Sequence, residues 1–172
     1  MFENPLIAEA EWPKLAETPF KPLPPAYATQ RKAVAGLIAL VLAAAAAVPW
    51  GLAAFEVEVP GALKWGALLA SAGLFGGVWV NAVVGFRYMG YAVRRYDVTF
   101  KSGWLFRTRV TVPMSRIQHS EIFRGPLDRW LGLSTLRIYT AGSSGANLSI
   151  PGLQDETAQA IRSTLISHGA QH

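Results

Sequence analysis

The chain of 172 residues contains three histidines and no cysteine, so acid–base or metal chemistry would rest on few side chains. His119 stands two residues before Glu121, and alternate residues of a strand share a face, so the two could form an acid–base pair. We favour a simpler interpretation, in which they form a structural pair on a strand. His168 and His172 lie near the C-terminal end, and no carboxylate pair stands at metal-ligand spacing from either.

Motifs of the common enzyme classes are absent from the sequence. It contains no G-x-S-x-G element, no P-loop and no Rossmann glycine pattern. Without cysteine, disulfides and thiolate metal sites are excluded. The sequence therefore predicts a protein that is not an enzyme, with no catalytic residue, no metal site and no cofactor.

Basic residues are better candidates for a functional site. The net charge is +5, and the excess lies late in the chain: residues 1–32 are neutral, residues 33–86 carry −1 and residues 87–172 carry +6. Five of the late bases come early in this last region: Arg94, Arg95, Lys101, Arg107 and Arg109. Near an anionic leaflet each basic side chain is worth about 1 kcal/mol, so the five predict a surface for anionic lipid headgroups. The alternative is ordinary solvation of strand faces. Nucleic acid fits poorly, because stacking aromatics are not interleaved on this basic face.

Two long apolar runs precede these bases. The chain is 51% hydrophobic and only 16% charged, against about 25% charged in a typical soluble domain. Residues 33–55 and 65–86 form runs of 23 and 22 residues without a formal charge, and about 20 apolar residues cross a hydrocarbon core as a helix. These runs predict two transmembrane helices joined by an external turn at 56–64. Pro49 is expected to kink or end the first helix.

Charges at the ends of the runs predict the orientation. Arg31 and Lys32 precede the first run, and Arg87, Arg94 and Arg95 follow the second. Under the positive-inside tendency both ends face the cytoplasm, so residues 1–32 and 87–172 are expected there. The chain is thus predicted to be a multi-pass protein of the plasma (inner) membrane.

Small residues recur on the second predicted helix at Gly73, Gly77, Asn81 and Gly85. Such a stripe allows close backbone approach, and an Asn amide can hydrogen-bond a neighbouring helix. We favour packing against the first helix of the hairpin. The alternative is a seam for a homo-oligomer or for a partner in a larger membrane complex.

The segment "TPFKPLPPAY", at residues 18–27, carries four prolines and therefore favours an extended conformation. It could be a ligand for a proline-binding groove. We favour a stiff cytoplasmic segment that leads into the first helix.

After residue 87 the pattern changes to strand-like alternation. "YAVRRYDVTF" and "LFRTRVTV" are expected to be strands separated by the turn "KSG", and in the second Phe106, Thr108, Val110 and Val112 share one face. "RIQHSEIF", "TLRIYTAG" and a short "LSI" ending at Pro151 are further strands, with a helical turn in "GPLDRWLGL" that buries three leucines. "LQDETAQAIRSTLISHG" has the apolar spacing of an amphipathic helix. The fold class is therefore a two-helix transmembrane hairpin plus an α+β domain, a small antiparallel barrel or sandwich with a C-terminal capping helix.

The stretch "VPMSRIQHSEIFRGPLDRWLGLSTLRIYTAG", followed by "LSIPGLQDETAQAI", resembles the bacterial membrane-flanked, pleckstrin-homology-like (PH-like) domain family. The match covers about residues 30–168. The positions that carry the motif are Pro113, Arg116, Ile117, Gly125, Pro126, Leu127, Leu131, Gly132, Leu133 and Leu136. We treat Arg116, Arg124 and Arg129 as scaffold, and Arg129 with Asp128 or Arg116 with Glu121 could form structural ion pairs.

The resemblance implies a split β-barrel of pleckstrin type at the cytoplasmic face of the plasma membrane. We count at most six strands in the sequence, where a full pleckstrin barrel has seven. The expected function is a membrane-anchored scaffold module for protein contacts, anionic-lipid contacts or both. An accessory subunit of a larger complex is the alternative, and by analogy the resemblance also suggests a role in envelope stress or resistance to membrane-active peptides.

Overall fold

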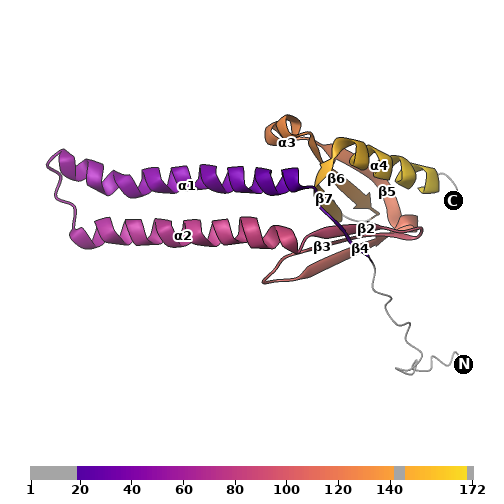
Figure 1. The fold of residues 1–172 in the computed structure, drawn as a ribbon, viewed down its shortest axis with the longest axis horizontal. Coiled ribbons are helices and arrows are strands. Elements are labelled where there is room, and N and C mark those ends of the chain that lie inside the picture. Colours follow the sequence, from indigo (N-terminus) through magenta and orange to yellow (C-terminus); the bar gives the residue numbers. More distant parts are fainter. Residues whose placement is uncertain (1–18, 142–145, 170–172) are drawn as a thin grey trace, which may run out of the picture.

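The computed structural model describes residues 19–141 and 146–169, which form a pair of long antiparallel helices with a β-rich domain at one end (Figure 1). The helices are α1 (Pro25–Ala54) with 30 residues and α2 (Gly61–Arg87) with 27. At 1.5 Å per residue each is about 40 Å long or more, which suffices to cross a bilayer. In the most apolar 18-residue stretch of each helix, only 11% of α1 and 6% of α2 is buried. Their apolar side chains thus face outward, unlike those of a core helix in a soluble domain.

Both helices extend beyond the apolar runs from which they were predicted. α1 begins at Pro25, because proline suits the first helical position, so Arg31 and Lys32 lie inside it. Pro49 does not end the helix, which continues to Ala54. α2 begins inside the predicted external turn and ends at Arg87. Residues 1–18 of the predicted N-terminal segment (1–32), and His172, lie outside the described residues.

Small residues line the seam between the two helices. Ala35 and Ala46 of α1 and Ala82 and Gly85 of α2 are the buried residues of this pair. Small side chains let the backbones approach closely, which is how helices associate where no water is displaced. The buried residues of the seam are therefore small, and the ring pairs Trp50–Trp65 and Tyr27–Phe86 join the two helices near their ends.

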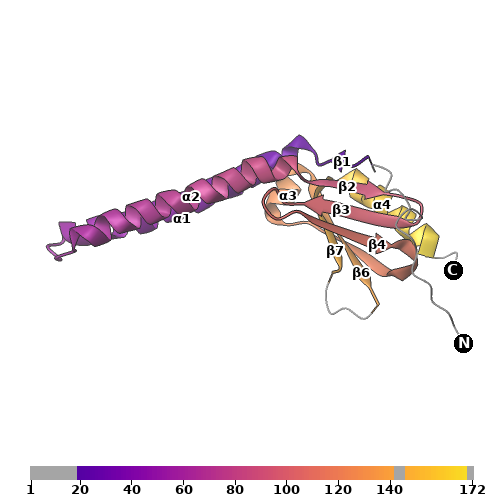
Figure 2. The same ribbon diagram turned by 90° about the horizontal axis from the view of Figure 1, so that it is seen from below.

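The β-rich domain consists of two antiparallel sheets, two short helical elements and a closing helix (Figures 1 and 2). The first sheet has the order β1 (Lys21–Pro22), β2 (Gly90–Val93), β3 (Asp97–Ser102), β4 (Thr108–Pro113). The second has the order β5 (Ile117–Phe123), β6 (Leu133–Thr140), β7 (Leu148–Gln154). A 3-10 turn (Met114–Arg116) joins the sheets, α3 (Pro126–Leu131) joins β5 to β6, and α4 (Asp155–Gly169) ends the domain. The predicted sandwich with a C-terminal capping helix is confirmed.

The seventh strand, missing from the six predicted, comes from the N-terminal side of α1. Lys21 pairs with Tyr91 and Pro22 with Gly90, so β1 forms the edge of the first sheet. The helical hairpin is therefore inserted between the first two strands of that sheet. The predicted stiff segment is thus in part a strand of the β domain.

Three other strand predictions need correction. "YAVRRYDVTF" is not one strand but the hairpin β2–β3, closed where the Arg94 N–H donates to the Asp97 carbonyl (2.8 Å). β4 begins only at Thr108, and Phe106 lies in the preceding loop. β7 continues through Pro151 to Gln154, because Gly152 with φ +67° lets the chain bend within the strand.

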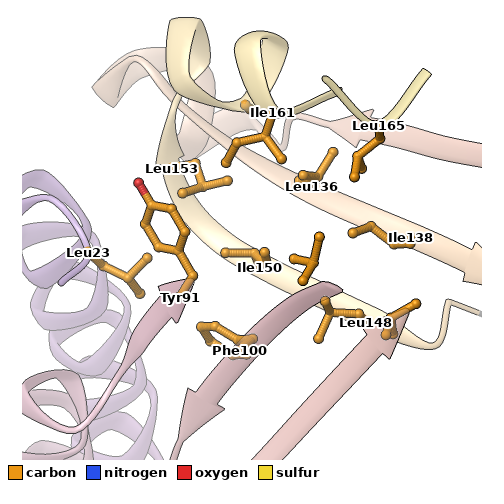
Figure 3. Packing of buried hydrophobic residues seen from close by; sticks show 13 residues of the cluster. Leu23, Tyr91, Phe100, Leu136, Ile138, Leu148, Ile150, Leu153, Ile161 and Leu165 are labelled. Atoms are coloured by element: carbon orange, nitrogen blue, oxygen red, sulfur yellow. The ribbon is translucent and has the colours of Figure 1, made fainter. Parts of the chain in front are cut away.

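The core lies between the two sheets and under α4 (Figure 3). Tyr91, Val98 and Phe100 of the first sheet face Leu136, Ile138 and Ile150 of the second. α4 closes the core with the buried side chains of Ala158, Ile161 and Leu165, while Ile166 is exposed. Leu23, which links β1 to α1, is buried in the same cluster. The start of α1 is therefore part of the core of the β domain.

A carboxylate fixes the start of α4. Asp155 accepts hydrogen bonds from the Ser134 hydroxyl (2.6 Å) and the Gln159 amide (2.9 Å) and lies 3.4 Å from an Arg124 nitrogen. The Ser134 bond in particular, and the Arg124 charge, hold the pKa of Asp155 below its usual value of 3.8, against the opposing effect of burial. The charged form thus ties α4 to β6.

We predict that this tie makes the stability of the domain pH-dependent in the acid range. Because the folded pKa is depressed, the stabilisation is complete above about pH 4 and is lost as the pH falls through the folded pKa. Ser134→Ala removes the largest cause of the depression, so this variant should be less stable than the wild type at neutral pH, and the difference should shrink in acid. Thermal unfolding of the full chain in nanodiscs between about pH 6 and pH 3 measures this.

Ser163→Ala is the matched control, since the Ser163 hydroxyl bonds only within α4, to the Ala160 carbonyl (2.9 Å). Its unfolding temperature should follow the wild-type pH profile. A constant difference between Ser134→Ala and wild type across the acid range would contradict the assignment.

Candidate functional site at the base of the helical hairpin

The candidate site is the end of the β domain from which α1 and α2 leave. In both views the β3–β4 loop and α3 lie at this end, and the β2–β3 turn lies at the opposite end (Figures 1 and 2). α3 packs against α1, and Trp104 of the β3–β4 loop lies beside Gly85 near the end of α2. Three sets of residues meet here: contacts that seat α1 on the domain, basic side chains, and exposed apolar side chains.

Tyr27 of α1 seats the helix on β7. Its ring lies against the backbone of Gly152 so closely that a Cβ at that position would overlap the ring. The same ring lies 6.3 Å from that of Phe86 at the end of α2. Gly152 is thus required for two reasons, its positive φ and the approach of Tyr27.

Asp128 of α3 makes the second contact with α1. This buried carboxylate accepts a hydrogen bond from the Gln30 amide (2.6 Å) and another from the Gly125 N–H (2.9 Å), which caps α3. Its oxygens are therefore engaged, and the expected ion pair with Arg129 is not among the ion pairs of the described residues. The role of Asp128 is to hold α3 against the start of α1.

Arg31 makes the third contact, between the helices. Its guanidinium donates to the Asn81 carbonyl of α2 (2.8 Å) and to the Met89 sulfur (3.3 Å). It lies beside Gly85, where a Cβ would be 3.4 Å from an Arg31 nitrogen and 3.6 Å from the Trp104 ring. From the sequence, Arg31 was predicted only to orient the first helix in the membrane.

The predicted small-residue stripe is divided by the structure. Gly85 lies in the seam, and Asn81 contributes its carbonyl there. Gly73 and Gly77 do not face α1: both are exposed, and a Cβ at either would meet nothing within 4 Å. The hairpin interpretation is therefore wrong for these two. Both faces of α2 are apolar, so the sequence does not tell them apart.

The five predicted headgroup residues are also divided. Lys101 and Arg109 are cross-strand partners near the β3–β4 loop, and their charged groups lie 4.5 Å and 5.1 Å from the centre of the Phe20 ring. Arg107, in that loop, lies over the Tyr88 ring at 5.8 Å. The structure thus brings three bases together at the base of the hairpin.

Arg94 and Arg95 lie instead at the far end of the sheet. Arg94 is 3.7 Å from Asp97, and Arg95 lies over the Tyr96 ring at 5.6 Å. The six residues of β3 separate this turn from the β3–β4 loop, a distance of about 20 Å. The two groups of bases therefore cannot belong to one compact site.

The motif residues build α3 and its junctions. Gly125 precedes the helix, Pro126 is its first residue and Gly132 ends it in the left-handed conformation (φ +65°), as predicted. Of the three leucines expected to be buried together, only Leu133 is buried; Leu131 is partly exposed and Leu127 exposed. The remaining motif positions have simpler roles: Leu136 in the core, Pro113 at the end of β4, Arg116 in the 3-10 turn and Ile117 at the start of β5.

Exposed apolar side chains at this end were not predicted from the sequence. The β3–β4 loop exposes Trp104, Leu105 and Phe106, and α3 exposes Leu127 and Trp130. Strand alternation was extended through residues 105–107, and the leucines of α3 were assigned to a core. The predicted turn "KSG" does bend the chain at Gly103, whose φ is +88°, but the loop continues to residue 107 before β4 begins at Thr108.

The His119–Glu121 pair is a surface cluster. The His119 ring stacks on Tyr139 (4.3 Å between centres), and the Tyr139 hydroxyl donates to Glu121 (2.9 Å). Glu121 is thus engaged by Tyr139, and the predicted pair with Arg116 is not among the ion pairs of the described residues. Within residues 19–141 and 146–169 no three His, Asp or Glu side chains are grouped as metal ligands.

The family model described as "Bacterial PH domain" matches residues 22–168 of this chain. Among curated proteins, the UPF0699 transmembrane protein YdbS of Bacillus subtilis is 37% identical over 75 residues, which are 44% of this chain and 45% of the relative. The chain thus matches less than half the length of that relative. No solved structure matches significantly.

We predict that a side chain at position 152 lowers the stability of the domain by more than backbone strain alone, because it would also displace the Tyr27 ring. Gly152→Ala should destabilise the full chain by about 2 to 4 kcal/mol, because strain at positive φ adds to displacement of the Tyr27 ring. Gly132→Ala is the matched control: its φ is +65° and a Cβ there meets nothing within 4 Å, so only about 1 to 2 kcal/mol is expected. Thermal unfolding in nanodiscs compares the two, and equal losses would show that Tyr27 does not seat the helix.

Proposed function

The chain belongs to the bacterial PH domain family, and we propose that it is a non-enzymatic, membrane-anchored module that contacts anionic lipid at the inner membrane surface. The observation that carries this proposal is the fixed seating of the domain on its own membrane hairpin. β1, Tyr27, Gln30 and Arg31 each tie the start of α1 to the domain or to α2. The domain is therefore held with one particular end toward the bilayer.

The basic side chains at that end support a lipid contact. Lys101, Arg107 and Arg109 gather beside the end of α2, whereas Arg94 and Arg95 lie about 20 Å further away. Attraction to an anionic leaflet is worth about 1 kcal/mol per base and falls off within a Debye length of about 8 Å. The first group lies within this range of the headgroups and the second does not.

The charges at the two ends of the hairpin support a cytoplasmic domain. Arg31 and Lys32 of α1 and Arg87 of α2 stand at the domain end, while Glu56 and Glu58 stand at the turn. Basic residues next to membrane helices are enriched on the cytoplasmic side. We therefore assign the turn to the outside and the domain to the inside of the plasma membrane.

We predict that the triple variant Lys101→Gln/Arg107→Gln/Arg109→Gln binds anionic lipid up to about 100-fold more weakly, since three contributions of about 1 kcal/mol are removed. Phosphatidylglycerol retained by the protein, measured by native mass spectrometry after extraction into nanodiscs, reports this loss.

The matched control is Arg94→Gln/Arg95→Gln, which removes bases of the same type at the far end of the sheet. It should retain lipid as the wild type does. An equal loss in both variants would show that overall charge, and not this end of the domain, attracts lipid.

A second function, as an accessory subunit of a larger complex or as a homo-oligomer, is supported by the outward face of α2. Gly73 and Gly77 form an open, small-residue surface that the hairpin does not use. Helices pack closely in membranes through such surfaces. This role requires no catalysis by the chain itself.

We predict that Gly73→Leu/Gly77→Leu removes polypeptides, or further copies of the chain, from the extracted complex without unfolding the hairpin. Gly36→Leu on α1 is the control, since a Cβ there also meets nothing within 4 Å. Native mass spectrometry compares the complexes of the wild type and the two variants. Unchanged masses in both variants would argue against docking through this face.

A further inference from the structure

We propose that the domain inserts two apolar edges into the interface of the bilayer that its helices cross, an inference that rests on the proposed membrane anchoring. One edge is the β3–β4 loop with Trp104, Leu105 and Phe106, and the other is α3 with Leu127 and Trp130. We name these five residues the interfacial rim. The rim is a second membrane contact in addition to the hairpin, and it consists of apolar side chains only.

The two edges flank the hairpin at its base. α3 packs against α1, to which Asp128 ties it through Gln30. The loop packs against α2, where the Trp104 ring lies beside Gly85. Both edges lie at the end where the helices leave the domain (Figures 1 and 2).

The depth of the loop follows from its contact on α2. Gly85 belongs to the uncharged run of residues 65–86, so Trp104 reaches the level of the last apolar turn of the helix. Leu105 and Phe106 follow Trp104 directly, and all three come after the turn at Gly103 (φ +88°) that ends β3. The tip of the loop therefore lies at the level of the headgroup and acyl boundary.

The chemistry of the rim suits that boundary. Phe106 is 83% exposed and Trp130 81% exposed, although a turn in water normally carries small polar residues. Leu127 and Trp130 lie three residues apart on one face of α3, while Asp128 points to α1. Trp side chains are enriched at the membrane–water interface, and Arg107 and Arg129 stand beside the two edges as cations for the headgroups.

The absence of cysteine from the chain makes the test direct, since single cysteines can be introduced without removing any. Phe106→Cys and Trp130→Cys report on the rim, and Leu74→Cys, 60% exposed in the middle of α2, reports on the bilayer core. Tyr96→Cys, at a 73% exposed residue of the β2–β3 turn, reports on water. Each full-length variant receives a nitroxide label and is placed in phosphatidylglycerol and phosphatidylcholine nanodiscs. Spin relaxation by oxygen and by a water-soluble nickel complex then gives the depth of each label.

Labels at 106 and 130 should lie in the interface: more relaxed by oxygen and less by nickel than the label at 96, and shallower than the label at 74. If both instead match the label at 96 while the label at 74 lies in lipid, the rim is overturned and the anchoring stands. Labels at 106 and 130 that neither oxygen nor nickel reaches would mean that protein covers these residues, which also overturns the inference. If the label at 74 is exposed to nickel, the proposed anchoring itself fails.

Discussion

The position of the β domain on the helical hairpin depends on one constraint: the chain forms a strand of the β domain before it enters the membrane. β1 pairs with β2 across the whole hairpin, and only Leu23 and Pro24 separate β1 from α1. On the return path only Tyr88 and Met89 separate α2 from β2. With both connections two residues long and Leu23 in the core, the domain cannot turn freely about the helices. A tether on one side only would leave such freedom.

This constraint explains the use of small and buried polar groups at the junction. Two helices that begin and end on one small sheet must lie close together, and Ala35, Ala82 and Gly85 make this possible. Gly152 then lets the Tyr27 ring rest on β7, and the buried Asp128 carboxylate is satisfied by Gln30 and by the Gly125 N–H. A buried carboxylate without such partners would be costly, so these hydrogen bonds specify one seating of α1.

Features that depend on local composition were predicted well from the sequence. Membrane helices need only an uncharged apolar run, and α3 needs only Pro126 at its start and Gly132 at its end, so both were found. β1 was missed, because two residues carry no periodicity and their partners Gly90 and Tyr91 are about 70 positions away.

The site could be predicted only in part, because it depends on which way side chains face. A membrane helix is apolar on all sides, so the outward position of Gly73 and Gly77 leaves no sequence signal. In the same way, the five basic residues do not lie together. The chain reverses at the turn that begins at Arg94, so Arg94 and Arg95 lie at the far end of the sheet. Only pairing in three dimensions separates them from Lys101, Arg107 and Arg109.

The rigid seating also decides how strong a membrane contact of the domain must be. A free domain would have to overcome the loss of translational and rotational freedom, and a few exposed apolar and basic residues would hold it only weakly. Here the short connections at Leu23 and Tyr88 keep the domain at the bilayer permanently, so each lipid contact is an intramolecular event at high effective concentration. Contacts of about 1 kcal/mol each are then sufficient to keep one surface of the domain against the bilayer. In the proposed function the hairpin thus supplies the membrane affinity, and the proposed lipid contacts at its base need only orient the domain.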